Sequence, residues 1–588
     1  MPWAIFNRPS LQLATLKSYL YKQDDSLAVS SFHPYLSVAA ALGAELYHAV
    51  SLDGWIGEAV YAALLFPEKY EEVKRFAGRR LRKAALATDV DFDEMVAAVG
   101  KATGDYLAEI NRHNFDLIGF SICFYQLLPA VYAARLLKRK FPEIPIVFGG
   151  SGCPEAQGLV QNFEEVDYCI TGEGEEALLA LCHVLQGRDE ILPSMVAARN
   201  FPVGQRATGD CRIADLQVLP VPDYSEYFLE KQQYFSSQPF IPVLPLEFSR
   251  GCWWNKCTFC NLNQQWQGYR AKSRQQMIAE VEQLSRAYQC LDFAFADNIL
   301  PIREGREFFS EIAASGRDLS FFAEMRTSER KNFTEYSRAG LQSVQVGIEA
   351  LSNSLLQKMN KGVSVIENLA AMKDAAAAGI YLEGNLIVEF PGSTEEEVAE
   401  TLSNLDFARS FHPLTASAFF LGHGSPVDET PGRYGIQSIS VHPAYKTMIP
   451  SAHLAGLTLP VKNYTGDLTR QKRMWKPVRK KVGLWKKFHN ERHSLYYHQP
   501  LCYRDGGGFM IIRQEIPDGR VLHHKLQGFS RSVYLTAQSI CTIEDLLKKH
   551  PSVKENSLIA FVEDLVAKKI FFRDGDKCLA LAIRNGNR

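Results

Sequence analysis

The chain has 588 residues, of which 46% are apolar and 22% charged, and its formal net charge is -1. This length exceeds what one hydrophobic core supports and predicts about three or four domains. The near-neutral balance gives no general preference for nucleic acid or another polyanion, and no apolar run reaches the roughly 18 to 20 residues of a membrane span. Twelve cysteines at mostly irregular spacing do not indicate a disulfide framework. We expect a cytoplasmic protein with reduced thiols and no membrane partner.

The first part of the chain alternates strand-like apolar runs with amphipathic helical segments. Residues 116–121, 144–148 and 166–171 have the pattern of buried strands, and residues 130–139 that of a crossover helix. This alternation predicts a parallel sheet in a doubly wound, Rossmann-like α/β domain, whose ligand binds at the carboxyl ends of the strands. Glycines at these ends let a ligand approach the backbone, although ordinary turns use glycine as well. From about residue 186 to 240 the periodicity is lost, which predicts a linker.

A second α/β series begins near residue 244. Helical segments such as 274–287 and 366–378 separate short apolar strands. About six βα units predict an open, partial TIM-type (β/α)6 barrel, whose active site lies at the carboxyl ends of the strands. The predicted strands are residues 246–249, 293–296, 321–325, 344–348, 384–388 and 417–420.

The segment at residues 470–492 is strongly basic. It holds ten Lys or Arg residues against one acidic residue, Glu491, with aromatic residues between them. Such a run is compatible with a surface for RNA or for an acidic peptide. The alternative is a solvated helix face that buries Trp475 and Trp485 on its inner side.

The tail of the chain indicates a further small domain. Residues 543–549 and 557–568 have helical patterns, and the apolar runs 570–572 and 578–583 flank a turn. Two helices followed by a hairpin predict a small α+β domain that resembles a winged helix. The predicted division is a Rossmann-like domain at 1–235, a barrel domain at 236–445 and a substrate- or leader-recognition domain at 446–588.

Three cysteines are closely spaced. Cys252, Cys257 and Cys260 form a C-x4-C-x2-C motif directly after the strand that opens the barrel series. Three thiolates suit a [4Fe-4S] cluster, because they ligate three irons and leave the fourth open for S-adenosylmethionine (SAM). The alternative is zinc, which typically needs a second Cys or His pair. No histidine occurs between His183 and His412.

This motif and several longer strings resemble the radical SAM superfamily, and within it the cobalamin-binding proteins that mature ribosomally made peptides (RiPPs). The resemblance covers about residues 1–430 and implies a [4Fe-4S] cluster, SAM and cobalamin as cofactors. The chain departs from the common C-x3-C-x2-C spacing by one residue. It also lacks an Asp-x-His-x-x-Gly motif, so cobalamin would bind without a histidine lower ligand. The strings are MPWAIFNRPSLQLATLKSYL, IGFSICFYQ, IVFGGSGCPEAQG, YCITGEGEEAL, SRGCWWNKCTFCNLN, ADNILP, VQVGIEALSNSLLQKMNKG and VEFPGSTEEE.

The resemblance also implies individual site residues. The three cysteines match the cluster ligands, and Trp253, Trp254 and Phe259 are expected to form an apolar cover over the cluster. For Asp297 and Asn298 the alternative is a turn or a helix cap. The implied SAM contacts are Asp297, Asn298, Glu324 and Asn385, and the implied cobalamin contacts are Ser121, Gln126, Gly149, Gly150, Ser151, Gly172 and Glu173.

Together these features predict a cobalamin-dependent radical SAM C-methyltransferase that acts on a peptide with a leader and receives electrons from a flavodoxin- or ferredoxin-type donor. Radical methyl transfer needs no general acid or base, and the sequence offers no carboxylate pair or Ser-His-Asp set, so no catalytic residue is nominated. One alternative is a radical peptide maturase that cyclises, epimerises or forms a ring without methyl transfer. Another is a tRNA-modifying enzyme, although nucleic acid is not the expected partner.

Overall fold

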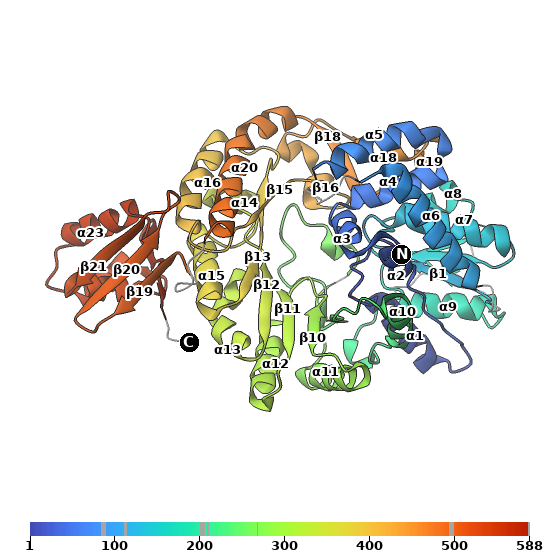
Figure 1. The fold of residues 1–588 in the computed structure, drawn as a ribbon, viewed down its shortest axis with the longest axis horizontal. Helices are drawn as coiled ribbons and strands as arrows, with labels where there is room; N and C mark the ends of the chain where they lie inside the picture. The colour runs from blue at the N-terminus through green and yellow to red at the C-terminus, as the bar shows by residue number, and fades with distance from the viewer. Residues whose placement is uncertain are drawn as a thin grey trace.

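The computed structural model describes residues 1–83, 90–110, 115–189, 191–199, 206–207, 211–266, 268–492 and 499–585. Three parts lie in a row along the long axis: an N-terminal α/β part, a central barrel-like part and a small C-terminal lobe (Figure 1). No helix in these ranges is long and apolar enough to cross a lipid bilayer.

The N-terminal part begins with six helices that the sequence patterns left unassigned. The last five of them pack into a bundle around buried aromatic side chains such as Tyr35, Tyr47 and Tyr61, and α4 and α6 continue this core onto the sheet, whereas the first helix buries Leu11 and Ala14 in the core of the barrel part. The helices are α1 (Leu11–Gln23), α2 (Pro34–Leu42), α3 (Ala44–Leu52), α4 (Gly54–Leu65), α5 (Tyr70–Leu81) and α6 (Phe92–Glu109).

The first sheet follows this bundle. Its strands are β1 (Ile118–Ser121), β2 (Ile146–Gly149), β3 (Tyr168–Ile170) and β5 (Val196–Ala198), and its helices are α7 (Leu127–Lys140), α8 (Ala156–Asn162) and α9 (Glu175–Leu185). β1, β2 and β3 are parallel, as predicted, and β5 is antiparallel to β3. α7 and α8 cover one face, where Phe148 is buried, and α9 covers the other, where Val147 is buried. The predicted α/β domain is confirmed, but the strand order β1-β2-β3-β5 has no reversal of the kind found in a full doubly wound sheet.

The predicted linker is partly ordered. Residues 190, 200–205 and 208–210 lie outside the described residues, whereas β4 (Leu192–Pro193), β6 (Arg206–Ala207) and α10 (Ser225–Phe235) are defined elements. α10 buries Tyr227 and Phe235 in the N-terminal core. This segment is therefore not only a connection, because its aromatic residues extend the first domain.

The second α/β series forms the central part. Its strands are β7 (Leu244–Leu246), β10 (Asp292–Phe295), β11 (Ser320–Met325), β12 (Leu341–Val346), β13 (Tyr381–Glu383), β14 (Asn385–Val388) and β15 (Thr415–Ala418). Its helices are α11 (Arg274–Tyr288), α12 (Ile302–Ser315), α13 (Phe333–Arg338), α14 (Asn353–Lys358), α15 (Val365–Ala378) and α16 (Glu395–Ala408).

These strands give the six predicted βα units. Five of them form a parallel sheet in the order β13-β12-β11-β10-β7, and β14 pairs with β15. The fifth unit is broken at Gly384, where a Cβ would lie 2.9 Å from Leu414 Cδ2. A bridge between Glu349 and Leu386 links the two sheets. The result is an open, partial barrel.

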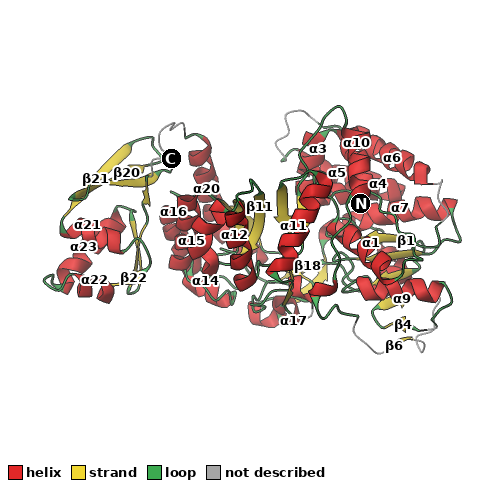
Figure 2. Ribbon diagram, turned by 90° about the horizontal axis from the view of Figure 1, so that it is seen from below, coloured by secondary structure: helices red, strands yellow, loops and turns green. Residues whose placement is uncertain are grey.

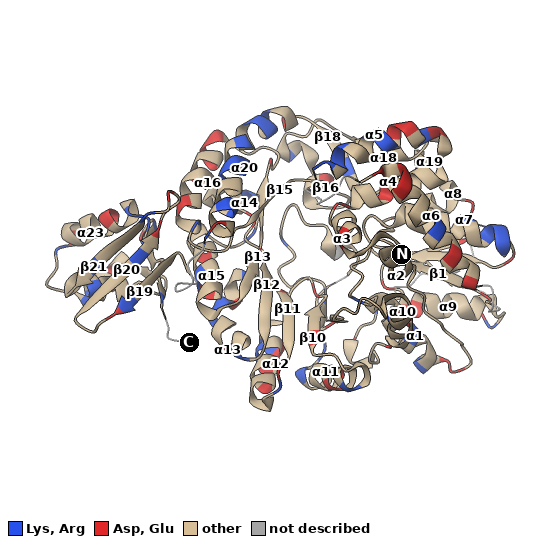
Figure 3. Ribbon diagram, viewed as in Figure 1, with Lys and Arg blue, Asp and Glu red and all other residues tan. Residues whose placement is uncertain are grey.

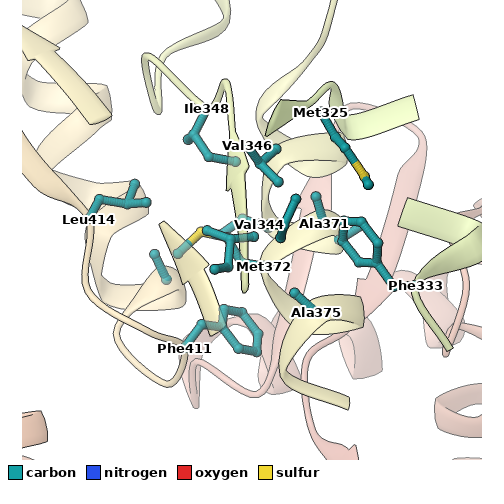
Figure 4. Packing of buried hydrophobic residues seen from close by; sticks show 14 of the residues in the cluster. Met325, Phe333, Val344, Val346, Ile348, Ala371, Met372, Ala375, Phe411 and Leu414 are labelled. Atoms are coloured by element: carbon teal, nitrogen blue, oxygen red, sulfur yellow. The ribbon is translucent and has the colours of Figure 1, made fainter. Parts of the chain in front are cut away.

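Alternation along the strands separates the outer core from the barrel interior. Val344 and Val346 of β12 pack against Ala371, Met372 and Ala375 of α15 (Figure 4). A capping box between Ser364 and Glu367 begins α15 and fixes its approach to the strands. The residues between the outward-facing ones therefore face the interior.

Residues 421–490 pack on both larger parts. The elements are β16 (Leu421–Gly422), α17 (Pro426–Glu429), β17 (Ser438–Val441), α18 (Pro443–Met448), α19 (Ser451–Leu454), β18 (Val461–Thr465) and α20 (Leu468–Asn490). β18 pairs with β16 and β17, α18 contacts α4 and α5, and α20 packs on α16. The predicted boundary at 445/446 thus falls inside one three-stranded sheet, and a division after α20 agrees better with these contacts.

The C-terminal lobe lies beside α15, at the far end from the N-terminal part (Figure 2). It contains β19 (Leu501–Asp505), β20 (Phe509–Glu515), β21 (Val521–Gln527), α21 (Phe529–Thr536), β22 (Cys541–Thr542), α22 (Ile543–Lys549), α23 (Glu555–Ala567), β23 (Phe571–Asp574), β24 (Lys577–Ala580) and β25 (Ile583–Arg584). The two predicted helices and the hairpin are present. An antiparallel sheet of β19, β20 and β21 precedes them, which the sequence patterns did not indicate.

Candidate active site

The cysteine motif occupies the loop after the first barrel strand. β8 (Ser249–Arg250) pairs with β9 (Arg270–Ala271), and the chain then turns at Gly251, whose φ is +83°. A Cβ on Gly251 would lie 2.3 Å from Gly268 O, so only glycine fits there. This turn directs residues 252–260, here called the cluster loop, over the carboxyl ends of the barrel strands.

The three thiols are half-buried and influence one another electrostatically. Burial raises the pKa of Cys260 to about 11. Burial also raises the pKa of Cys257, against the opposing charges of Lys361 and Arg326. Without a bound group Cys257 and Cys260 are thus protonated at neutral pH, and a ligated metal would have to displace their protons.

The donor set fits an iron-sulfur cluster better than a single ion. None of the three cysteines forms a disulfide. Among the described residues, no group of three or more His, Cys, Asp or Glu side chains is arranged to hold a metal ion, so the three thiols have no fourth side-chain ligand grouped with them. Structural zinc needs four such ligands close together, whereas three thiolates suffice for a [4Fe-4S] cluster with one open iron. Two buried donors, Trp253 Nε1 and Asn298 Nδ2, have no partner in the described part of the chain, which fits a polar ligand at this edge.

Asp297 has a different environment from its neighbour Asn298. Its carboxylate is buried and accepts hydrogen bonds from the backbone N–H groups of Phe248 (3.1 Å) and Ser249. Burial raises its pKa to about 7. Asp297 therefore fastens the strand that leads into the cluster loop, which is neither the turn nor the helix cap of the alternative, while the Asn298 Nδ2 amide has no partner among the described residues.

Glu324 and Glu349 lie at the ends of neighbouring strands. Burial, followed by the nearby Glu349 charge, raises the pKa of Glu324 to about 7, and the structure records no hydrogen bond to the Glu324 carboxyl among the described residues. Lys361 forms an ion pair with Glu349 at 2.9 Å. A Cβ at Gly347 would lie 2.4 Å from Lys361 Nζ, so this glycine makes room for the lysine. Glu324 is a free polar group at this edge.

The barrel interior carries further polar groups. Asn385 Oδ1 accepts a hydrogen bond from Ser417 Oγ at 2.9 Å. From the N-terminal segment, the Arg8 guanidinium lies 5.8 Å from the Phe322 ring centroid, and its buried Nε has no partner in the described ranges. The Glu383 charge acts on Arg8 without forming an ion pair. Arg8 and Glu383 thus present a donor and an acceptor to the interior.

The predicted cobalamin residues lie together at the carboxyl edge of the first sheet. Gly150 has a φ of +103°, and a Cβ there would be 2.6 Å from Ile122 O. Around Gly172, whose φ is +78°, a Cβ would meet no atom within 4 Å. Ser121 and Gly149 end β1 and β2, and Ser151 Oγ bonds Cys123. A flat ligand could approach the backbone here.

Two of these residues are engaged within the protein. Gln126 Oε1 accepts from Cys123 N at 3.0 Å, and its Nε2 donates to Met1 O at 2.8 Å. Glu173 accepts from Arg250 at 2.8 Å and from Arg270 at 2.5 Å. Their side chains hold the first domain together and attach it to the barrel, so any contact to cobalamin would come from their backbone.

Arg250 is the centre of this attachment. Its side chain is 4% exposed and contacts Glu173, Glu175 (2.5 Å) and Glu247 (2.8 Å). Glu173 follows β3, Glu175 begins α9, and Arg250 stands two residues before Cys252. The network therefore joins the carboxyl edge of the first sheet to the start of the cluster loop.

Sequence reasoning missed Arg326, Lys361 and Arg8. Arg326 and Lys361 lie near Cys257 in space but follow strands and helices far from it in sequence. Arg326 comes two residues after the predicted site residue Glu324, at the end of β11. This position at a strand end is the one sequence signal that could have indicated Arg326. Arg8 belongs to a segment without periodicity, and nothing in its neighbours connects it to the barrel.

An α/β domain followed by a six-unit open barrel, with a three-cysteine loop at the barrel's ligand edge, is the architecture of a radical SAM protein with an accessory cofactor domain. Family models agree: a B12 binding domain matches residues 83–182, and the radical SAM superfamily matches residues 246–405. The chain is a radical SAM enzyme of the cobalamin-binding type.

Three curated relatives have similar sequences. An uncharacterized methyltransferase of Pyrococcus horikoshii is 26% identical over 368 residues, which cover 59% of this chain and 79% of the relative. The hopanoid C-3 methylase of Methylococcus capsulatus is 27% identical over 302 residues (48% and 55%). An anaerobic magnesium-protoporphyrin IX monomethyl ester cyclase of Rubrivivax gelatinosus is 26% identical over 359 residues (57% and 61%). The chain therefore spans less than two thirds of two of these relatives.

The fold is also found in a solved structure. The cobalamin-dependent S-adenosylmethionine radical enzyme OxsB with aqua-cobalamin bound superposes with a TM-score of 0.50 at 16% identity. The match covers 67% of this chain and 63% of that protein. At this identity the likeness concerns the fold alone.

Proposed function

We propose that this chain is a cobalamin-dependent radical SAM C-methyltransferase that methylates an unactivated carbon of a ribosomal peptide. The observation that carries the proposal is the buried network around Arg250. It brings the ligand edge of the B12-binding domain against the strand that enters the cluster loop. Two cofactors bound at these edges would face a common space. Methyl transfer requires the reacting groups to be held close together in this way. Two of the similar relatives are described as a methyltransferase and a methylase, which supports the reaction class.

The residues present divide the work of binding. When bound, the cluster and SAM supply a 5'-deoxyadenosyl radical, and cobalamin supplies the methyl group. Cys252, Cys257 and Cys260 would hold the cluster, and the free Asn298 amide would hold a polar end of SAM. A flavodoxin- or ferredoxin-type protein would deliver the electron.

The interior of the barrel fits a peptide segment. Arg8 offers N–H donors and Glu383 offers an acceptor, the complement of a peptide unit, which carries one C=O and one N–H. Neither side chain has an ion-pair partner among the described residues, and a bound amide would satisfy the buried Arg8 Nε, which has no hydrogen-bond partner there. This arrangement orients the substrate without any acid or base.

A leader would bind away from the barrel interior, on α20 and the C-terminal lobe. The buried side of α20 carries Trp475 and Trp485, as predicted by the alternative in which the basic run is a solvated helix face. Its outer face exposes Lys472, Lys476 and Lys480 at four-residue spacing. Figure 3 shows several stretches of Lys and Arg along α20. Like charges at this spacing repel, and an acidic leader segment would relieve that repulsion.

The reaction is tested with anaerobically reconstituted full-length enzyme, hydroxocobalamin, methyl-deuterated SAM, a low-potential reductant and a candidate precursor peptide chosen from the neighbouring genes. We expect a peptide product heavier by one deuterated methyl group in place of hydrogen, together with S-adenosylhomocysteine and 5'-deoxyadenosine. Cys257→Ala should abolish 5'-deoxyadenosine formation. Cys290→Ala, which removes a buried thiol outside the loop, should retain it.

Other products would identify the alternatives. Turnover by enzyme that holds no cobalamin would overturn methyl transfer from that cofactor. A product of unchanged mass or one lighter by two hydrogens would indicate epimerisation or cyclisation. Salt-sensitive tRNA binding that is lost on replacing Lys472, Lys476 and Lys480, with no effect on the peptide, would indicate a tRNA-modifying enzyme.

A further inference from the structure

The two tryptophans of the cluster loop hold a cation and do not simply form an apolar cover. The rings of Trp253 and Trp254 lie 6.3 Å apart at 88° to each other. The guanidinium carbon of Arg326 lies 4.4 Å from the Trp254 ring centroid and 5.5 Å from that of Trp253. Both distances are within the range of cation–π attraction. The longer gap between Cys252 and Cys257 thus accommodates two aromatic contacts to one arginine.

The loop is fastened from the opposite side. Trp254 Nε1 donates to Asn360 O at 3.0 Å, and Thr258 N donates to Met359 O at 3.0 Å. A Cβ on Gly362 would lie 2.2 Å from the Trp254 ring, so the indole rests directly on the backbone there. These contacts fix the Trp254 side chain independently of Arg326.

Arg326 connects this clamp to a cysteine. It follows β11 directly, is 7% exposed, donates to Lys361 O and hydrogen-bonds the Cys257 side chain. No carboxylate of the described residues forms an ion pair with it, since the nearby Glu349 pairs with Lys361. A buried cation is costly without a negative partner. The partner present is sulfur, which becomes negatively charged when Cys257 ligates iron.

We propose that Arg326, clamped by Trp253 and Trp254, is a positioning residue that fixes Cys257 and stabilises the reduced form of the cluster. The inference rests on the proposed function, because it needs a cluster on the three cysteines. Reduction adds one negative charge to the cluster, and a fixed positive charge with a hydrogen bond at a ligating sulfur favours that state. A one-electron donor of the flavodoxin type would then reduce the cluster more completely.

The test is an EPR-monitored redox titration of reconstituted full-length enzyme without SAM or substrate. Arg326→Met should lower the ratio of reduced to oxidised cluster about tenfold at a fixed potential, which is about 59 mV for a one-electron couple. Arg326→Lys keeps the charge and should give a smaller decrease. Arg330→Met is the matched control, because Arg330 is a half-buried arginine of the same segment that pairs with Asp374. It should leave the ratio unchanged.

A wild-type ratio in Arg326→Met with full iron content would overturn the proposal. If that variant does not retain iron, Trp254→Phe and Gly362→Ala decide the question. Both loosen the clamp while the guanidinium remains, so both should lower the ratio, and an unchanged ratio in both would refute the clamp. A wild-type chain that assembles no four-iron cluster would instead overturn the proposed function.

Discussion

Replacing Arg250 by Met should destabilise the contact between the B12-binding domain and the barrel. The methionine fills similar space but removes the cation from a site that is 4% exposed. Glu173 keeps Arg270, whereas Glu175 and Glu247 lose their only recorded arginine. Removing one partner of a buried ion pair costs about 3–5 kcal/mol. We therefore expect the free energy of unfolding to fall by about that amount at pH 7.

The pH dependence of this loss gives a second readout. In the native protein burial raises the pKa of Glu247, but the charge and hydrogen bonds of Arg250, together with the charges of Lys272 and Arg270, outweigh burial and hold the pKa below its ordinary value. That contribution is present above the unfolded pKa of about 4.5 and is lost as pH falls through the lower folded value. The deficit of the variant should therefore be full at pH 7 and shrink below about pH 5.

The assay is urea unfolding of the full chain, monitored by circular dichroism at pH 7 and at a pH below about 5. Arg303→Met is the control, since Arg303 is 82% exposed and pairs with Glu307 on the surface, where such a pair contributes at most about 1 kcal/mol. Equal unfolding midpoints for the two variants at pH 7 would show that the Arg250 network does not hold the domains together.

Three further changes test other parts of the structure. Gly150→Ala forces a φ of +103° on alanine and a contact of 2.6 Å between its Cβ and Ile122 O, so it should weaken hydroxocobalamin binding in equilibrium dialysis. Gly432→Ala, which has open space around its Cβ, should leave binding unchanged. Equal binding by both variants would contradict the assignment of cobalamin to this edge of the first sheet. Burial lowers the pKa of His489 to about 4, so between pH 6.5 and 4 the unfolded chain binds a proton at this residue that the folded chain does not, and stability falls as the pH falls. His489→Gln should therefore be less acid-sensitive than the native chain, by at most about 2 kcal/mol at pH 5, and parallel unfolding curves would refute this. Lys373 Nζ donates to Gln538 O at 2.6 Å and Ala580 O at 2.8 Å, so Lys373→Met should release the C-terminal lobe to limited proteolysis, and an unchanged digest would show that the lobe docks by other contacts.

The regular elements could be predicted from the sequence because their patterns are local. Alternating apolar strands and 3.6-residue helical periodicity located β1, β2, β3 and all six barrel units. The N-terminal bundle was missed because it lies outside the α/β alternation. The ordered part of the linker was missed for a related reason: β5 and α10 are short, and their packing partners are distant in sequence.

The residues of the candidate site could likewise be predicted only in part from the sequence. The spacing of Cys252, Cys257 and Cys260 by itself predicted cluster chemistry, since three thiolates within nine residues need no tertiary information to indicate a ligand set. Only the tertiary structure decided that Glu173 pairs with Arg250, that Asp297 accepts hydrogen bonds from the backbone of the strand before the cluster loop, and that Arg326 contacts two tryptophans. The physical reason is that burial, charge pairing and ring contact depend on atoms brought together from separate segments of the chain. The sequence therefore determined which chemistry this protein supports, and the fold decided which side chains are free to take part in it.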